Sequence, residues 1–173
     1  MTKRMVLIAV ALLALSPVLA HAQVVASLAG LHGITEAAVT ATADQVPEDL
    51  YSFQATEEVR TLGQLLAHIA DANYQFCSAA SSDINPNTGS IEQTKTTKAD
   101  IQAALASAFA YCREVYANTT DAQGAEMVPL FGGQEMARSA VLAFNSAHTY
   151  EHYGNLVTYM RLNGITPPTS MPQ

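Results

Sequence analysis

The chain has 173 residues, of which 49% are hydrophobic, and this is enough material for one domain with a core of ordinary size. Only 8 residues are Lys or Arg, against 15 Asp or Glu, which gives a net charge of −7. A nucleic acid or an anionic membrane binds clustered Lys and Arg, so we expect neither as a partner.

The first 22 residues have the features of a secretory signal peptide. Lys3 and Arg4 precede an almost wholly apolar stretch, and Ala20-His21-Ala22 supplies the small-x-small pattern at which signal peptidase cleaves. The stretch is shorter than the roughly 20 residues of a membrane-spanning helix. We expect a signal peptide over 1–22, with a retained anchor as the alternative.

Cleavage would leave a mature domain over 23–173. We expect this domain to be periplasmic or secreted and not to insert stably into a membrane. Loss of Lys3 and Arg4 leaves 8 − 2 = 6 basic residues against 15 acidic ones, a net charge of −9. An oxidising compartment would also allow the two cysteines, Cys77 and Cys112, to pair.

Four segments of the mature chain predict helices, and none predicts a sheet. Thr56 is expected to cap the second helix, Thr97 with Asp100 the third, and Gly164 to end the fourth. The helices are expected at about 24–45, 58–80, 98–118 and 134–163, separated by loops at 81–97 and 118–133. Helices of comparable length, each with one apolar face, predict an all-α four-helix bundle.

His148 and His152 form an H-x-x-x-H pair in the last helix. Residues four apart lie about 40° apart around a helix, so both imidazoles can share one metal ion. Val141, Phe144, Tyr159 and Leu162 are expected on the same, inward face. Such pairs also occur on ordinary helix surfaces, so this spacing alone leaves both interpretations open.

His68 is the candidate third ligand, because it lies in the second helix at the edge of the apolar face. Three imidazoles would leave coordination positions open for water or substrate. The alternative is a core histidine hydrogen-bonded to a neighbour. For His32, in the weakly patterned first helix, we expect a surface or packing role.

Two of these segments resemble proteins of the DinB/YfiT-like superfamily. The stretch Arg60-Thr61-Leu62-Gly63-Gln64-Leu65-Leu66-Ala67-His68-Ile69-Ala70 resembles their second helix, and the stretch from His148 to Gly164 resembles their last. The resemblance implies a three-histidine metal site of His68, His148 and His152, holding zinc or nickel. It also implies an up-down-down-up bundle in which the second and third helices are parallel. A homodimer is a further possibility for the partner.

Parallel second and third helices would place Cys77 and Cys112 at comparable heights. Cys77 lies about 180° from His68 around its helix, so it can face the third helix while His68 faces the fourth. We therefore expect a disulfide between Cys77 and Cys112, with two buried free thiols as the alternative.

The resulting functional hypothesis is an exported, metal-dependent enzyme of hydrolase or thiol-transfer type, acting on a small molecule. The family's characterised members resemble enzymes that use a small cellular thiol. Glu151 is the candidate catalytic acid or base, with Asp71, Tyr74 and Tyr150 as further candidates near the metal. The alternative is a non-catalytic helical bundle that binds a metal or a small ligand.

Overall fold

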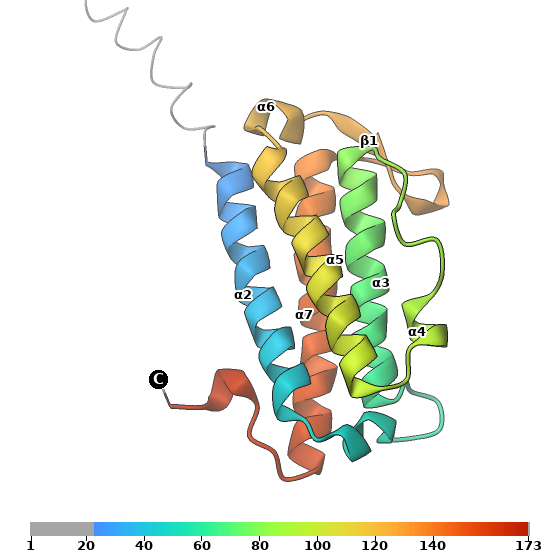
Figure 1. Ribbon diagram of the computed structural model, residues 1–173. Helices are drawn as coiled ribbons and strands as arrows, with labels where there is room; N and C mark the ends of the chain where they lie inside the picture. Colours follow the sequence, from blue (N-terminus) through green and yellow to red (C-terminus); the bar gives the residue numbers. More distant parts are fainter. Residues whose placement is uncertain (1–22, 173) are drawn as a thin grey trace, which may run out of the picture.

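The computed structural model describes residues 23–172, so the predicted signal peptide lies outside the described residues. Four long helices make up the bundle, with short elements in the connections (Figure 1). The long helices are α2 (Val24–Gln45), α3 (Leu62–Ser81), α5 (Lys98–Asn118) and α7 (Arg138–Leu162). The short elements are η1 (Glu48–Ser52), α4 (Ile91–Thr94), α6 (Asp121–Gly124), β1 (Met127–Pro129), η2 (Phe131–Gly133), β2 (Glu135–Ala137) and η3 (Pro168–Ser170).

The helices pack as a square in which α3 and α2 each contact both α5 and α7. In Figure 1, α3 and α5 run in one direction, and α2 and α7 run in the other. This is the expected up-down-down-up order. Since α3 and α5 are parallel neighbours, the chain between them must run back along the length of the bundle. Residues 82–97, which we call the crossover, make that connection and contain α4.

The long helices begin where side chains satisfy their first backbone N–H groups. Thr97 accepts a hydrogen bond from the Asp100 amide at 3.2 Å, and α5 has the expected bounds. The second helix begins at residue 62 rather than 58, so the expected cap at Thr56 is wrong. Thr61 accepts from the Gln64 amide, and the Gln64 side chain accepts from the Thr61 amide, a reciprocal capping box.

A small β-hairpin precedes α7, where the sequence predicted only a loop and the start of a helix. β1 and β2 pair antiparallel, with Val128 opposite Met136. The expected start of the last helix at 134 is therefore wrong, as is the expectation of no sheet. Gly132 and Gly133 at the tip have φ values of +75° and +73°, which glycine adopts readily.

Cys77 of α3 and Cys112 of α5 form the expected disulfide, with their Cα atoms 5.4 Å apart. Both residues are wholly buried in the core. At the far end of α7, the Ile165 amide donates to the Met160 carbonyl at 2.9 Å, and Gly164 has a φ of +72°. These features make Gly164 the expected helix-ending glycine.

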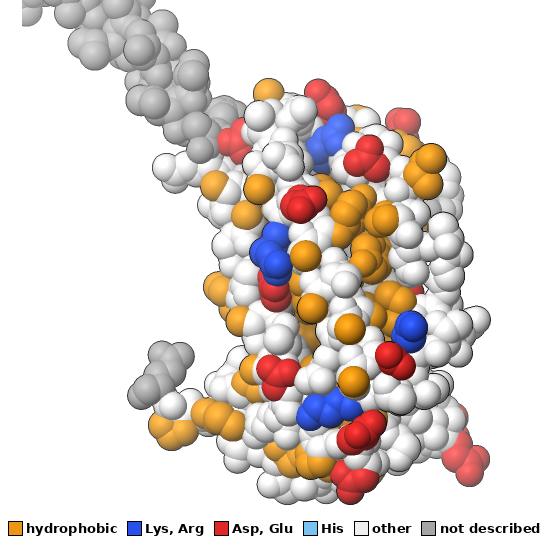
Figure 2. Space-filling model, viewed as in Figure 1, with side chains coloured by type: hydrophobic (Ala, Val, Ile, Leu, Met, Phe, Trp, Pro, Cys, Tyr) orange, Lys and Arg blue, Asp and Glu red, His pale blue; other side chains and the backbone are white. Residues whose placement is uncertain are grey.

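Among the described residues, one helix, α2, is long and apolar enough by length and composition to cross a membrane. In the bundle its inner face is buried through residues such as Ala38, Val39 and Ala43. On the face of the molecule seen in Figure 2, Lys and Arg side chains are separated from one another and lie among acidic ones.

Candidate metal centre

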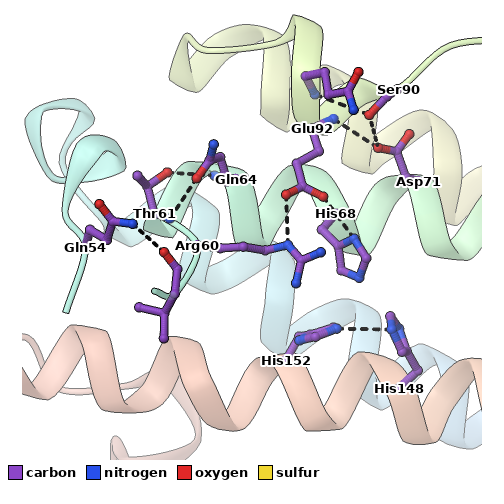
Figure 3. A network of polar contacts seen from close by, with 12 residues as sticks. Gln54, Arg60, Thr61, Gln64, His68, Asp71, Ser90, Glu92, His148 and His152 are labelled. Carbon is purple, nitrogen blue, oxygen red and sulfur yellow. Dashed lines mark hydrogen bonds and ion pairs between the residues drawn. The ribbon is translucent and has the colours of Figure 1, made fainter. Parts of the chain in front are cut away.

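Three histidines from two antiparallel helices converge at the α3–α7 contact (Figure 3). His68 comes from α3, and His148 and His152 come from successive turns of α7. One ring nitrogen of each lies within 4.8 Å of those of the other two. The structure therefore brings together all three ligands expected from the sequence.

The geometry of the α7 pair fits a shared metal ion. The Nε2 atoms of His148 and His152 lie 3.1 Å apart. Two imidazoles bound to one zinc ion at about 2.0–2.1 Å each hold their nitrogens roughly 3 Å apart, so the pair needs little rearrangement. Imidazole-only ligation suits zinc, nickel, copper or iron rather than calcium or magnesium. The residues present can hold a divalent transition metal.

His68 is oriented by Glu92 of α4, a residue that the sequence analysis missed. The His68 Nδ1 atom lies 3.1 Å from Glu92 Oε2, and Arg60 Nε donates to Glu92 Oε1 at 2.8 Å. A carboxylate accepts the proton on Nδ1, so the Nε2 lone pair of His68 is free for a ligand. The pattern Ser90-x-x-Gln93, a cap signal, could have indicated the helical turn that carries Glu92.

Asp71 of α3 fixes the crossover in front of the histidines. Its carboxylate accepts from the backbone amides of Ile91 and Glu92, each at 2.9 Å, and from the Asn87 side chain at 2.7 Å. Ser90 Oγ adds a contact of 3.3 Å. The structure thus gives Asp71 a positioning role on the turn that carries Glu92.

Burial lowers the pKa of all three histidines, because a charged imidazolium loses hydration inside the protein. The positive charge of Arg60 adds to this lowering for each of them. Glu92 acts in the opposite direction on His68. Neutral imidazoles are the form that binds a metal, so the site favours ligand-competent histidines at neutral pH.

Two of the histidines, His68 and His148, line a cavity of about 880 Å³, within the size range of small-molecule sites. Its lining combines two chemistries. Three aromatic side chains, Phe76, Phe131 and Phe144, line it, and Phe76 lies beside His148. The polar lining residues are Arg60, His68, Asp71, Gln75, Asn85, Asn87, Ser90, Glu92 and His148.

The other residues singled out in the sequence lie farther from this chemistry. Glu151 is exposed on α7, where its carboxylate partly opposes the lowering of the pKa of His148 and His152 by burial. Tyr74 packs against Tyr111, and Tyr150 packs against Tyr153.

The inward face expected for α7 is only partly buried. Val141 and Tyr159 are in the core, whereas Phe144 is 39% exposed and Leu162 is 62% exposed. Phe144 is exposed because it lines the cavity, and Leu162 because it is the last residue of the helix.

His32 shows the packing role expected for it. It is 1% exposed and stacks on Tyr116 of α5, with ring centroids 4.6 Å apart. Among the described residues, neither ring nitrogen has a hydrogen-bond partner.

An up-down-down-up bundle in which three histidines converge, two of them lining a cavity, is a helical bundle with a candidate metal centre. Residues 33–156 match the family model described as the DinB superfamily. The chain belongs to this superfamily, as the sequence resemblance predicted. Among curated proteins, none matches this chain.

Solved structures support the same fold. A DinB-like protein from Bacillus cereus has a TM-score of 0.68 at 21% identity, covering 78% of this chain and 89% of its own. A DinB-like protein from Bacillus subtilis has a TM-score of 0.67 at 20% identity, covering 85% and 96%. The mycothiol-dependent maleylpyruvate isomerase has a TM-score of 0.61 at 14% identity, covering 76% of this chain and 60% of its own.

Proposed function

We propose that this protein is a metal-dependent enzyme in which His68, His148 and His152 hold one divalent ion, zinc or nickel ahead of iron or manganese. The carrying observation is that three ring nitrogens lie within 4.8 Å of one another beside a cavity of about 880 Å³. A metal held by three imidazoles supplies a Lewis acid that lowers the pKa of a bound water or thiol.

The surrounding residues have separate roles in this proposal. Glu92 holds His68 in the tautomer that binds metal, and Asp71 holds the turn on which Glu92 lies. Glu151 remains the candidate for proton transfer, because it is exposed on α7 and its charge acts on His148 and His152. Hydrolysis needs only water, whereas thiol transfer, suggested by the isomerase of similar fold, needs a small thiol as co-substrate.

A non-catalytic binding protein is the second candidate. It is favoured by the state of Glu92, the carboxylate nearest to His68, which already accepts hydrogen bonds from His68 and Arg60. A group held in this way is poorly placed to act as a general base. The binding protein would show saturable ligand affinity with no turnover.

The test is metal analysis of protein purified without an affinity tag. We expect about one ion per chain, and about 100-fold or more weaker binding in His68→Ala, His148→Ala and His152→Ala, since each removes one of three ligands. His32→Ala is the control, because His32 is buried elsewhere. Stoichiometric metal in His68→Ala would contradict the three-histidine assignment.

Turnover is tested with ester, lactone and thiol-conjugation substrates, using protein with and without metal. Chelation should abolish the activity and metal readdition should restore it. A rate that complete chelation leaves unchanged would exclude the metal-dependent mechanism, whichever substrate is turned over.

We also propose that the protein acts outside the cytosol. The buried disulfide between Cys77 and Cys112 supports an oxidising compartment. The mass of the protein recovered from the periplasm or the medium should correspond to a chain beginning at Gln23. An intact N-terminus on the cytosolic protein would contradict export.

A further inference from the structure

The aromatic wall of the cavity is partly exposed, which is unusual for phenylalanine. Phe131 is 49% exposed and Phe144 is 39% exposed, while Phe76 behind them is buried. The Phe76 ring centroid lies 5.6 Å from that of Phe131 and 5.1 Å from that of Phe144. Three rings at these distances make one continuous apolar surface facing the cavity.

This aromatic surface adjoins the metal centre directly. The Phe76 and His148 ring centroids are 5.5 Å apart, and the same cavity is lined by His68, His148 and the aromatic rings. Phe131 comes from the hairpin that the sequence analysis did not predict, and its ring packs edge-on against the buried Phe76 while the residue stays 49% exposed. Its exposed part lines the cavity.

Arg60 supplies a cation to the same cavity. Its side chain is 41% exposed, and its Nε atom is bonded to Glu92. Among residues 23–172, its two terminal guanidinium nitrogens have no hydrogen-bond partner. In Figure 3 the guanidinium group lies between Glu92 and the histidines of α7. A guanidinium with free donors binds a carboxylate or a similar anion well.

We propose that this cavity binds an amphipathic organic anion, with its apolar or aromatic end against Phe131 and Phe144 and its anionic end at Arg60 and the histidine centre. The proposal rests on the proposed function, because it assigns a ligand class to the same site. The volume of about 880 Å³ accommodates such a molecule with room for a second, small reactant.

The probes are three simple compounds that separate the two ends of the ligand: phenylpropionate, propionate and phenylpropanamide. Calorimetric titration of the zinc-loaded protein should show phenylpropionate binding about ten-fold more tightly than propionate, which lacks the ring. Phenylpropionate should exceed the neutral amide by a similar factor, because only the carboxylate pairs with Arg60.

Single variants then assign each end. Phe131→Ala should remove most of the advantage of phenylpropionate over propionate, and Arg60→Gln should reduce its advantage over the amide, with the remainder coming from the zinc ion. Leu162→Ala is the matched control, since it truncates an exposed apolar side chain outside the cavity. Metal content and thermal midpoint are measured for every variant, so a folding or metal defect is recognised.

The proposal is overturned if phenylpropionate binds no better than propionate or the amide, or if Phe131→Ala behaves like Leu162→Ala. Failure of the metal assignment gives a different result. If the wild-type protein holds no metal, the same three probes titrated into that protein still report on Phe131 and Arg60. Loss of the differences between probes there would overturn the amphipathic-anion proposal independently.

Discussion

Polar or reactive side chains are buried both where α5 packs on α2 and α3 and where α3 packs on α7. Only at the α3–α7 contact do such side chains present ring nitrogens beside a cavity. Against α5, Cys77 and Cys112 are joined covalently and His32 stacks on Tyr116. Between α3 and α7, three histidines gather at the edge of a cavity. Burial lowers histidine pKa values in both regions, so a desolvated imidazole does not by itself identify a metal site.

The largest effect is expected at the contact between α3 and α5, where the disulfide lies. The double variant Cys77→Ala/Cys112→Ala should lower the free energy of unfolding by about 3–4 kcal/mol, because the disulfide restricts a loop of 35 residues in the unfolded chain. Urea denaturation of the oxidised wild type and the variant measures the difference. Metal content at low temperature should stay the same.

Wild-type protein denatured in a thiol reductant is the control, and it should resemble the double variant. An unchanged urea midpoint in the variant would show that this contact contributes packing but no constraint. A loss of metal in the folded variant would mean that the two sides of α3 are coupled, and the contrast between them would not hold.

The second effect concerns His32 and depends on pH. Burial, with a further contribution from Arg113, lowers its pKa from 6.5 to about 4. As pH falls below 6.5, the unfolded chain binds a proton that the folded protein does not bind until about pH 4. Stability is therefore fully present above this window and is lost on acidification through it, by about 3 kcal/mol.

The comparison is made between wild type and His32→Phe, which keeps a ring against Tyr116. Denaturation of metal-free protein at several pH values between 7 and 4 should show a smaller loss of stability in the variant, with the other histidines contributing equally to both. Parallel pH profiles would mean that His32 is hydrated or paired in solution.

The smallest effect concerns metal affinity at the α3–α7 contact. Glu92→Gln should weaken metal binding by about 10–100-fold, because the amide orients His68 less well than the carboxylate. Competition with a chromogenic chelator measures the affinity. Glu36→Gln is the matched control, since Glu36 also pairs with an arginine, Arg113, but lies on α2. Equal affinities in the two variants would remove Glu92 from the site.

Local signals predicted much of the helical frame. The segments at 24–45 and 98–118 have the expected bounds, because Pro47 and the Thr97 cap act within one turn of the helix end. The start of α3 was misplaced because Thr56 and Thr61 both offer a cap. The start of α7 was missed because residues 135–137 pair with 127–129, and three-residue strands have no period to detect.

The residues of the candidate site also fall into those that the sequence indicated and those that it did not. The H-x-x-x-H spacing indicated His148 and His152, the place of His68 at the edge of an apolar face made it the candidate third ligand, and the family resemblance favoured that role over a core histidine. Glu92 and Arg60 could not be assigned from the sequence, because their roles depend on where the crossover lies against α3. The same is true of Phe131, whose place in the cavity depends on the fold of a hairpin that precedes α7.

The parallel course of α3 and α5 has a consequence for how such a protein can diversify. All three candidate ligands lie in regular helices whose spacing is fixed by core packing, whereas the crossover contributes Asn85, Asn87, Gly89, Ser90 and Glu92 to the cavity. Loops tolerate replacement far better than packed helices do. A lineage with this topology can therefore vary the polar lining that the crossover gives to the cavity, with Glu92 kept, while the three histidines stay in place.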